Sequence, residues 1–233
     1  MNKELFLNEL KKINIEPTEE QLQQLEEYYT ILVEENKKYN LTNITEKEQV
    51  YLKHFYDSLT LSKIIELKNQ SLCDIGTGAG FPGMVLKIMF PTLKVTLIEA
   101  TEKKCNFLKK VINQLNLKNI DVINERAEIY SKQVREQYDI VTSRAVAPLK
   151  HLLEYSIPIV KVDGTYIAMK GDITKELEGI DNYEKKLTIE QQQILTFQLP
   201  IENSLRTLIS YTKKEKTNPR YPRKYNEIKK KEI

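Results

Sequence analysis

A glycine-rich stretch between a predicted strand and a predicted helix constrains the fold of this chain more than any other feature. It reads Asp74-Ile75-Gly76-Thr77-Gly78-Ala79-Gly80-Phe81-Pro82-Gly83 and follows the apolar segment Leu72–Ile75. Pro82 falls near the first turn of the following helix, where proline is tolerated. Glycines permit a sharp turn and let a ligand approach the backbone. The pattern therefore predicts a ligand at the carboxyl edge of a sheet, beside a helix N-terminus.

Apolar strand-like segments and amphipathic helices alternate from Ser71 onward. We predict strands at Leu72–Ile75, Val95–Ile98, Asp121–Ile123, Asp139–Thr142 and Thr165–Met169. We predict helices near Pro82–Phe90, Glu102–Leu115, Ala127–Arg135 and Val146–Val160. This order indicates an α/β fold with a mostly parallel sheet that is covered by helices on both faces.

The last two predicted strands depart from the parallel pattern. Ile194–Leu199 and Leu205–Tyr211 are separated only by Pro200-Ile201-Glu202-Asn203-Ser204. A parallel crossover needs roughly a dozen residues or more. The final pair must therefore be antiparallel.

The first part of the chain has helical periodicity and no strand signal. Thr18 and Gln21 have the spacing of a capping box, and apolar residues follow at helical intervals. The chain then divides into an N-terminal helical extension (1–70), a sheet domain that binds the ligand (71–216) and a basic tail (217–233). Its length of 233 residues suits one α/β domain with an extension.

Composition excludes several classes of protein. The sequence contains no run of about eighteen apolar residues, so no transmembrane helix is predicted. The N-terminus lacks the features of a signal peptide. We therefore expect no membrane association and a cytoplasmic location. Cys73 and Cys105 form neither a disulfide framework nor a metal-type cluster, and His54 and His151 have no accompanying ligand cluster, so no metal site is expected.

Positive charge concentrates at the C-terminal end. Residues 213–233 contain nine Lys or Arg and three Glu, a net charge of +6, whereas the whole chain carries +3. Residues 1–212 therefore carry 3 − 6 = −3. A basic end with interleaved prolines and tyrosines suits contact with a polyanion such as RNA. Because the tail follows the last predicted strand, we expect its removal to leave the sheet undisturbed.

The glycine-rich stretch fits two kinds of cofactor. Gly78–Gly83 matches the dinucleotide pattern G-x-G-x-x-G, and the whole stretch matches the D-x-G-x-G-x-G motif of class I methyltransferases. Glu99 ends the second strand and suits a ribose in either case. Asp74 suits the methionine end of S-adenosylmethionine, whereas a carboxylate there would repel a pyrophosphate.

Two later features favour S-adenosylmethionine. Ala127-Glu128 follows the third strand and suits recognition of the adenine amino group. The final antiparallel pair is typical of class I methyltransferases and not of the all-parallel dinucleotide fold. Arg144 ends a central strand at the same sheet edge, where it suits pairing with the methionine carboxylate or a substrate phosphate. The other interpretation of Arg144 is an arginine on a solvated loop.

Several segments together resemble one family, the bacterial small-subunit ribosomal RNA guanine-N7 methyltransferases (RsmG, formerly GidB). They are Asn40-Leu41-Thr42, His54–Leu59, Asp74–Gly83, Glu99 with Lys103-Lys104, Arg126-Ala127-Glu128, Ser143-Arg144-Ala145, Lys170-Gly171 and Tyr221-Pro222-Arg223. The resemblance implies a class I, Rossmann-like fold and cofactor contacts at Gly76, Gly78, Phe81, Ala127, Glu128 and Arg144. It also implies methylation of guanine N7 in the decoding region of 16S ribosomal RNA, within naked RNA or the small subunit.

The sequence assigns no catalytic residue, and a monomer is the expected state. Guanine N7 carries a lone pair and no proton, so alignment with the methyl group and exclusion of water are the main requirements. Two alternatives remain open at this point. One is a nicotinamide-dependent oxidoreductase, and the other is a non-catalytic RNA-binding protein that retains the cofactor fold.

Overall fold

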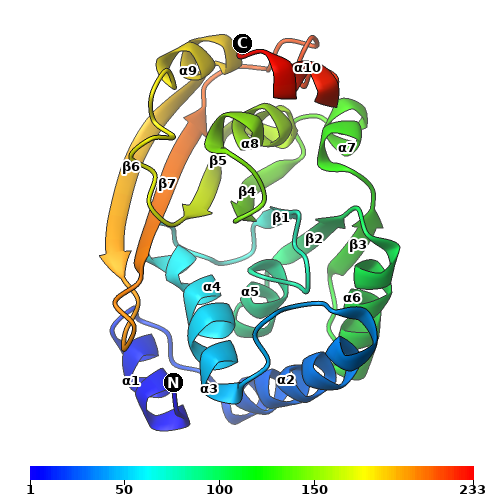
Figure 1. The fold of residues 1–233 in the computed structure, drawn as a ribbon, viewed down its shortest axis with the longest axis vertical. Helices are drawn as coiled ribbons and strands as arrows, with labels where there is room; N and C mark the ends of the chain where they lie inside the picture. Colours follow the sequence, from blue (N-terminus) through cyan, green and yellow to red (C-terminus); the bar gives the residue numbers. More distant parts are fainter.

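A seven-stranded sheet runs through the centre of the computed structural model, which describes residues 1–233 (Figure 1). The strands are β1 (Ser71–Ile75), β2 (Lys94–Glu99), β3 (Ile120–Asn124), β4 (Tyr138–Arg144), β5 (Val160–Lys170), β6 (Ile189–Gln198) and β7 (Leu205–Lys213). Their order in the sheet is β3-β2-β1-β4-β5-β7-β6. Strand β7 is antiparallel to both of its neighbours, and the pairs among β1 to β5 are parallel. The predicted sheet and its antiparallel end are therefore confirmed.

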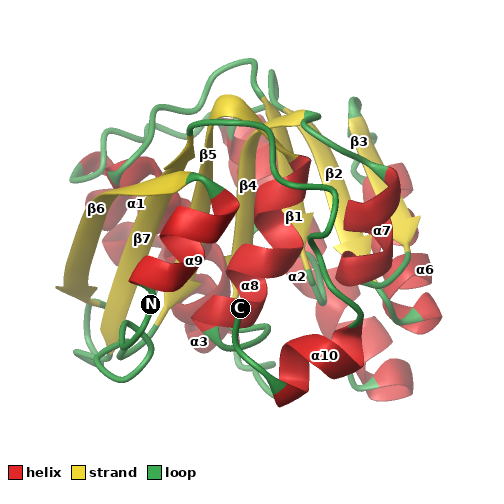
Figure 2. Cartoon of the chain, turned by 90° about the horizontal axis from the view of Figure 1, so that it is seen from above, coloured by secondary structure: helices red, strands yellow, loops and turns green.

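Helices cover both faces of the sheet, as Figure 2 shows. One face packs against α5 (Gly83–Met89) and α6 (Glu102–Gln114), and the other against α7 (Ala127–Gln133), α8 (Leu149–Ser156) with the short η3 (Ile157–Ile159), and α9 (Asp181–Leu187). Alternate residues of β1 face opposite sides of the sheet. Leu72 packs in the core on the side of α5 and α6, and Cys73 packs in the core on the side of α8 and α9. Both faces of the central strands are thus buried, as parallel strands require.

The N-terminal helices form a further layer outside α5 and α6. They are α1 (Lys3–Lys11), α2 (Glu19–Tyr39), α3 (Lys47–Val50), the π-helical η1 (Tyr51–Tyr56), α4 (Asp57–Leu59) and the 3₁₀-helical η2 (Thr60–Lys63). Helix α2 contacts α5 and α6, and α4 contacts α5. None of the helices is both long enough and apolar enough to span a lipid bilayer.

The predicted capping box at the start of α2 is present and also joins this layer to the sheet domain. The backbone N–H of Gln21 donates to Thr18 Oγ1 at 3.2 Å, and the backbone N–H of Thr18 donates to Gln21 Oε1 at 2.9 Å. The Gln21 side-chain amide then donates to the carbonyls of Ile88 and Met89, at 3.1 and 3.0 Å. The Gln21 side chain therefore takes part in capping the start of α2 and also satisfies carbonyls at the end of α5.

The C-terminal segment packs along α7 and α8 and ends near α9. Arg223 donates three hydrogen bonds to the fully buried Glu154 of α8, from its backbone N–H at 2.7 Å and from Nε and Nη2 at 2.8 Å. Arg135 donates to the carbonyls of Thr217 and Tyr221. A further helix, α10 (Tyr225–Lys230), follows. We expected removal of the tail to leave the sheet undisturbed. Removal would leave Glu154 without its partner in α8, a helix that packs on β4 and β5, so the tail is not an independent segment.

Two of the basic residues counted in the C-terminal end lie inside the protein. Lys213 is fully buried, and its ammonium donates to Glu136 Oε1 at 3.0 Å and to the carbonyls of Ile157 and Val160 at 2.9 Å. Arg223 is held by Glu154 in the same way. These two charges are neutralised within the fold, so the surface available to a polyanion is less basic than the sequence suggests.

Replacing Arg223 with alanine should lower the free energy of unfolding by about 3–5 kcal/mol, since it leaves a buried carboxylate without a cation. Urea unfolding followed by circular dichroism measures this change. Lys216→Ala serves as the control, because Lys216 is exposed in the same segment and its loss should change stability by no more than about 0.5 kcal/mol. Equal stability of the two variants would show that the tail does not depend on the buried pair.

Candidate active site

The glycine-rich loop turns sharply after β1 and is held by hydrogen bonds to a carbonyl of β2 and to the Asp74 side chain. The backbone N–H groups of Gly76 and Thr77 donate to the carbonyl of Ile98, at 2.9 and 3.1 Å. The Asp74 carboxylate accepts from Thr77 Oγ1 at 2.6 Å and from the Gly83 N–H at 2.8 Å. Asp74 is fully buried, and this burial raises its pKa to about 6 despite both hydrogen bonds.

Asp74 consequently supports the loop, and its fully buried carboxylate is not exposed to a ligand. Its expected position at the methionine end of a cofactor is therefore corrected.

A cavity of about 620 Å³, here called the first cavity, opens at the carboxyl ends of the parallel strands. It is lined by Ile75, Gly76, Gly78, Ile98, Glu99, Ala100, Lys104, Glu125, Arg126, Ala127, Glu128, Arg144, Ala145, Val146, Ala147, Pro148, His151, Tyr155, Tyr225 and Lys229. All the predicted site residues except Asp74 and Phe81 lie in this wall. The strand order brings them together, because the ends of neighbouring parallel strands meet at one edge.

Glu99 and Gly78 form one side of the first cavity. The Glu99 carboxylate accepts from the backbone N–H of Gly78 at 3.0 Å and from that of Thr101 at 2.8 Å. These bonds fix the side chain, and each oxygen keeps a lone pair for a ligand hydroxyl. A Cβ placed on Gly78 would meet no atom within 4 Å, so the loop faces open space at this position. The backbone and the carboxylate therefore fit a nucleoside.

The start of α7 forms another part of the wall of the first cavity. Ala127 and Glu128 are the first residues of the helix, where backbone N–H groups have no partner within the helix. The Glu128 carboxylate accepts a hydrogen bond from Arg126 Nε at 2.6 Å, and Glu128 is buried. An adenine edge, which carries both an acceptor and an amino donor, is complementary to the backbone N–H groups at the helix start and the Glu128 carboxylate.

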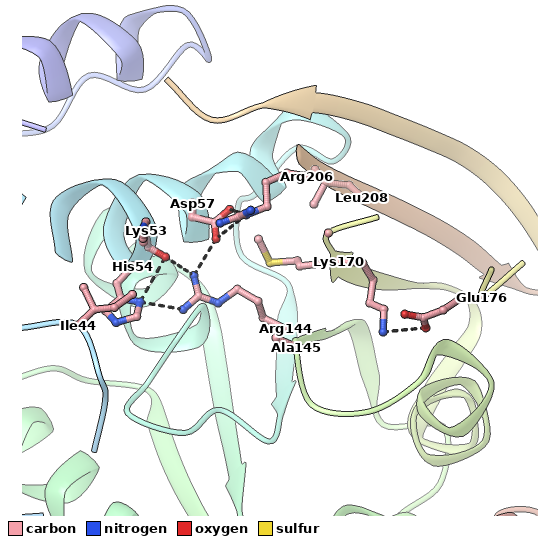
Figure 3. A pocket seen from close by; sticks show the side chains of 12 residues that line it. Ile44, Lys53, His54, Asp57, Arg144, Ala145, Lys170, Glu176, Arg206 and Leu208 are labelled. Atoms are coloured by element: carbon pink, nitrogen blue, oxygen red, sulfur yellow. Dashed lines mark hydrogen bonds and ion pairs between the residues drawn. The ribbon is translucent and has the colours of Figure 1, made fainter. Parts of the chain in front are cut away.

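A second cavity of about 480 Å³ adjoins the first and shares Arg144 and Ala145 with it (Figure 3). It is lined by Ile44, Lys53, His54, Asp57, Arg144, Ala145, Met169, Lys170, Gly171, Glu176, Arg206 and Leu208. The N-terminal helices, β4, β5, β7 and the segment after β5 all contribute. Cations outnumber carboxylates in this lining, which favours an anionic ligand.

Arg144 lies in the wall between the two cavities and is held by the N-terminal helices (Figure 3). Its Nη1 donates to the Lys53 carbonyl at 2.9 Å and to Asp57 Oδ2 at 3.2 Å, and its Nη2 lies 3.3 Å from His54 Nδ1. Asp57 also accepts from Arg206 Nε, at 3.1 Å to each oxygen. The side chain of Arg144 is only 14% exposed, so the interpretation as a solvated loop arginine is wrong.

Phe81 packs behind this wall. Its ring stacks on the His54 imidazole with centroids 4.2 Å apart, and the Arg144 guanidinium lies 5.3 Å from its centroid. Burial, and then the nearby Arg144 charge, lower the pKa of His54 to about 3, so the imidazole is neutral near pH 7. A neutral ring can accept a hydrogen bond from Arg144 at Nδ1 and donate from Nε2 to Thr42 Oγ1, 2.9 Å away.

Sequence reasoning assigned no role to Lys53, Asp57, Glu176 and Arg206. Lys53 and Asp57 are four residues apart, a spacing that places them on one helical face, and this signal was available. Nothing local in the sequence points from Arg206 to Asp57. The same holds for Tyr225 and Lys229, which the sequence placed in an RNA-contacting tail and which line the first cavity.

Comparison with known proteins identifies the family. The sequence pattern of the family described as rRNA small subunit methyltransferase G matches residues 21–206. The chain belongs to this family.

Relatives of high similarity carry the same description. Ribosomal RNA small subunit methyltransferase G of Bacillus cytotoxicus is 46% identical over 228 residues, which cover 96% of this chain and 95% of the relative. The protein of that description from one strain of Bacillus cereus is 47% identical over 230 residues, with the same coverage.

Solved structures of more distant proteins share the fold. A SAM-dependent methyltransferase from Aquifex aeolicus has a TM-score of 0.53 and 15% identity, covering 70% of this chain and 92% of its own. TYW2 of M. jannaschii, solved in complex with AdoMet, has a TM-score of 0.53 and 15% identity, covering 66% and 74%. At this identity the likeness concerns the fold alone, and it agrees with the predicted class I methyltransferase architecture.

Acidification should destabilise the folded protein, because His54 is buried in its neutral form. An unfolded histidine has a pKa of about 6.5, whereas that of His54 in the folded protein is about 3. The unfolded chain takes up the proton first, so stability that is fully present above about pH 6.5 is lost as the pH falls toward 3. The loss is at most about 1.4 kcal/mol per pH unit. In urea unfolding, the advantage of the wild type over His54→Gln should shrink between about pH 7 and pH 4.5.

Asp74 supplies a control of opposite sign. Its pKa is raised from 3.8 to about 6, so the folded protein takes up the proton first and gains stability as the pH falls through that interval. The wild type should gain relative to Asp74→Asn under the same conditions. A constant difference between the wild type and His54→Gln would mean that His54 titrates normally.

Proposed function

We propose that this chain transfers a methyl group from S-adenosylmethionine to N7 of a guanine in the decoding region of 16S ribosomal RNA. The observation that carries the proposal is the pair of adjoining cavities that meet at Arg144, one suited to a nucleoside and the other to an anionic ligand. Membership of the small-subunit ribosomal RNA methyltransferase G family supports the substrate.

The first cavity holds the methyl donor. Gly76 and Gly78 allow it to approach the loop, Glu99 accepts hydrogen bonds from the ribose hydroxyls, and Ala127 with Glu128 contacts the adenine. S-adenosylmethionine supplies an electrophilic methyl group on a sulfonium. Arg144 keeps its Nε–H free of protein partners and can donate it to the methionine carboxylate. Phe81 does not line the cavity; its ring packs against the Arg144 guanidinium and fixes the plane of that group.

The second cavity receives the guanine nucleotide. Lys53, Arg144 and Arg206 supply positive charge for the RNA backbone, which dominates RNA affinity. The target base must leave its stack to reach this depth. Because Arg144 and Ala145 line both cavities, a base in the second cavity lies next to a methyl donor in the first.

The protein needs no base for the transfer. The N7 lone pair attacks the methyl carbon while the carbon–sulfur bond breaks, and no proton has to be removed. The purine gains positive charge during the reaction, and the carboxylates of Asp57 and Glu176 lie in the same cavity. Negative charge placed near the base stabilises that developing charge. The neutral His54 imidazole adds no competing positive charge.

The same proposal sets the cellular setting. A substrate within the small ribosomal subunit places the protein in the bacterial cytoplasm, and we expect it to act as a monomer. The exposed basic residues of the tail, such as Lys216, Arg220 and Lys224, are the proposed contacts to phosphates outside the cavities.

Cells that lack this protein should lose one N7-methylguanine from 16S ribosomal RNA. Reduction with borohydride followed by aniline cleaves RNA at N7-methylguanine, and primer extension then locates the site. Expression of the wild type should restore it, whereas Arg144→Ala should not, since both cavities lose a wall. Unchanged cleavage in the deletion strain would exclude the proposed reaction and would favour a non-catalytic RNA-binding protein.

Calorimetry should show that the purified chain binds S-adenosylmethionine and not NAD. Glu99→Gln should weaken that binding about tenfold or more, because hydrogen bonds from ribose hydroxyls to a carboxylate contribute about 1.5–3 kcal/mol. Glu102→Gln is the matched control, since Glu102 is exposed at the start of α6. Equal affinity of Glu99→Gln and wild type would remove Glu99 from the ribose site, and binding of NAD alone would favour an oxidoreductase.

A further inference from the structure

The last helix of the chain reaches the cofactor end of the molecule. Figure 1 shows α10, in red, beside α7. Tyr225 and Lys229 of this helix line the first cavity. We propose that α10 forms the outer wall of the adenosine subsite, with the Tyr225 ring contacting the adenine. The identity of the ligand rests on the proposed function above.

Tyr225 is connected to the residues that recognise adenine. The Arg126 guanidinium lies 4.4 Å from the centroid of the Tyr225 ring, and Arg126 Nε donates to Glu128 Oε1 at 2.6 Å. Glu128 belongs to the first turn of α7, where the adenine edge is read. The ring, the guanidinium and the carboxylate therefore form one continuous edge of the cavity. Lys229 Nζ also lies over the ring, 5.1 Å from its centroid, and the exposed part of the ring offers a contact surface for a planar purine.

Contacts before, within and after the helix hold α10 in this position. The Arg223–Glu154 pair precedes the helix, with both side chains buried. Ile228 is 2% exposed on the helix itself. After the helix, Lys150 of α8 pairs with Glu232, and the carbonyl of Ile233 accepts from the Asn182 side chain at 3.2 Å. A segment anchored at three points has a defined place in the wall and is more than a solvated basic end.

The wall leaves the other face of α10 open. Asn226 and Lys230 are exposed and do not line the first cavity. Tyr225 itself is 36% exposed and lines the first cavity, so part of its surface can contact a ligand there. The tail therefore separates into residues that face the cofactor and residues that face solvent, and substitutions can address the two groups independently.

Calorimetry on the full-length chain tests the assignment. The ligands are S-adenosylhomocysteine and 5′-methylthioadenosine, which share the adenosine and differ in the amino-acid portion. Tyr225→Ala should bind both ligands about tenfold more weakly than wild type, by the same factor for each, because the lost contact is to the adenine. Tyr225→Phe keeps the ring and should bind both close to wild type. Lys230→Ala, on the solvent face of the same helix, should bind both like wild type.

Different failures have different meanings. If the wild type bound neither ligand, the proposed function would fail before this inference is reached. If the wild type bound both and Tyr225→Ala bound them equally well, only the wall assignment would fail. A loss confined to S-adenosylhomocysteine would also overturn it, because the contact would then be to the amino-acid end. Thermal unfolding of each variant checks the fold. A comparable loss of binding in Lys230→Ala would overturn the assignment, because the effect would then not depend on the Tyr225 ring.

Discussion

The carboxylate of Asp57 lies between two guanidinium groups, and the arrangement of the site depends on this interaction. Asp57 comes from the N-terminal helices, Arg144 from the end of β4 and Arg206 from β7. The Asp57 side chain is only 6% exposed. Its loss would leave two cations close together with little water to screen them, which is strongly unfavourable. The N-terminal extension is therefore a structural part of both cavities, because it supplies the charge that holds their common wall.

The buried ion pairs also change how the charge of the chain should be counted. Lys213 and Arg223 are each paired inside the protein, and Arg135 satisfies carbonyls of the tail. These cations stabilise the packing of the C-terminal segment and contribute little to attraction at a distance. The exposed cations of the segment remain for RNA, and their effect is screened by salt. A tail that appears uniform in composition thus performs structural and electrostatic tasks with different residues.

Local periodicity was sufficient to predict the strands, because each depends on its own apolar residues. The short connection before β7 determined its direction. The same reasoning found the residues at the strand ends, which topology gathers at one edge. It could not find the pairing of Asp57 with Arg206, which are 149 positions apart in the sequence. It also missed α9 and α10, whose short polar segments have weak periodicity. Asp74 was given a ligand-facing role because the sequence does not reveal that its carboxylate lies beneath the loop.

The shared wall has a thermodynamic consequence. Arg144 contributes to both cavities, and the C-terminal segment carries Tyr225 in the first cavity together with cations that face solvent. An interaction of RNA with Arg144 therefore also acts on the wall of the cofactor cavity. By linkage, any factor by which RNA changes the affinity for the cofactor is also the factor by which the cofactor changes the affinity for RNA.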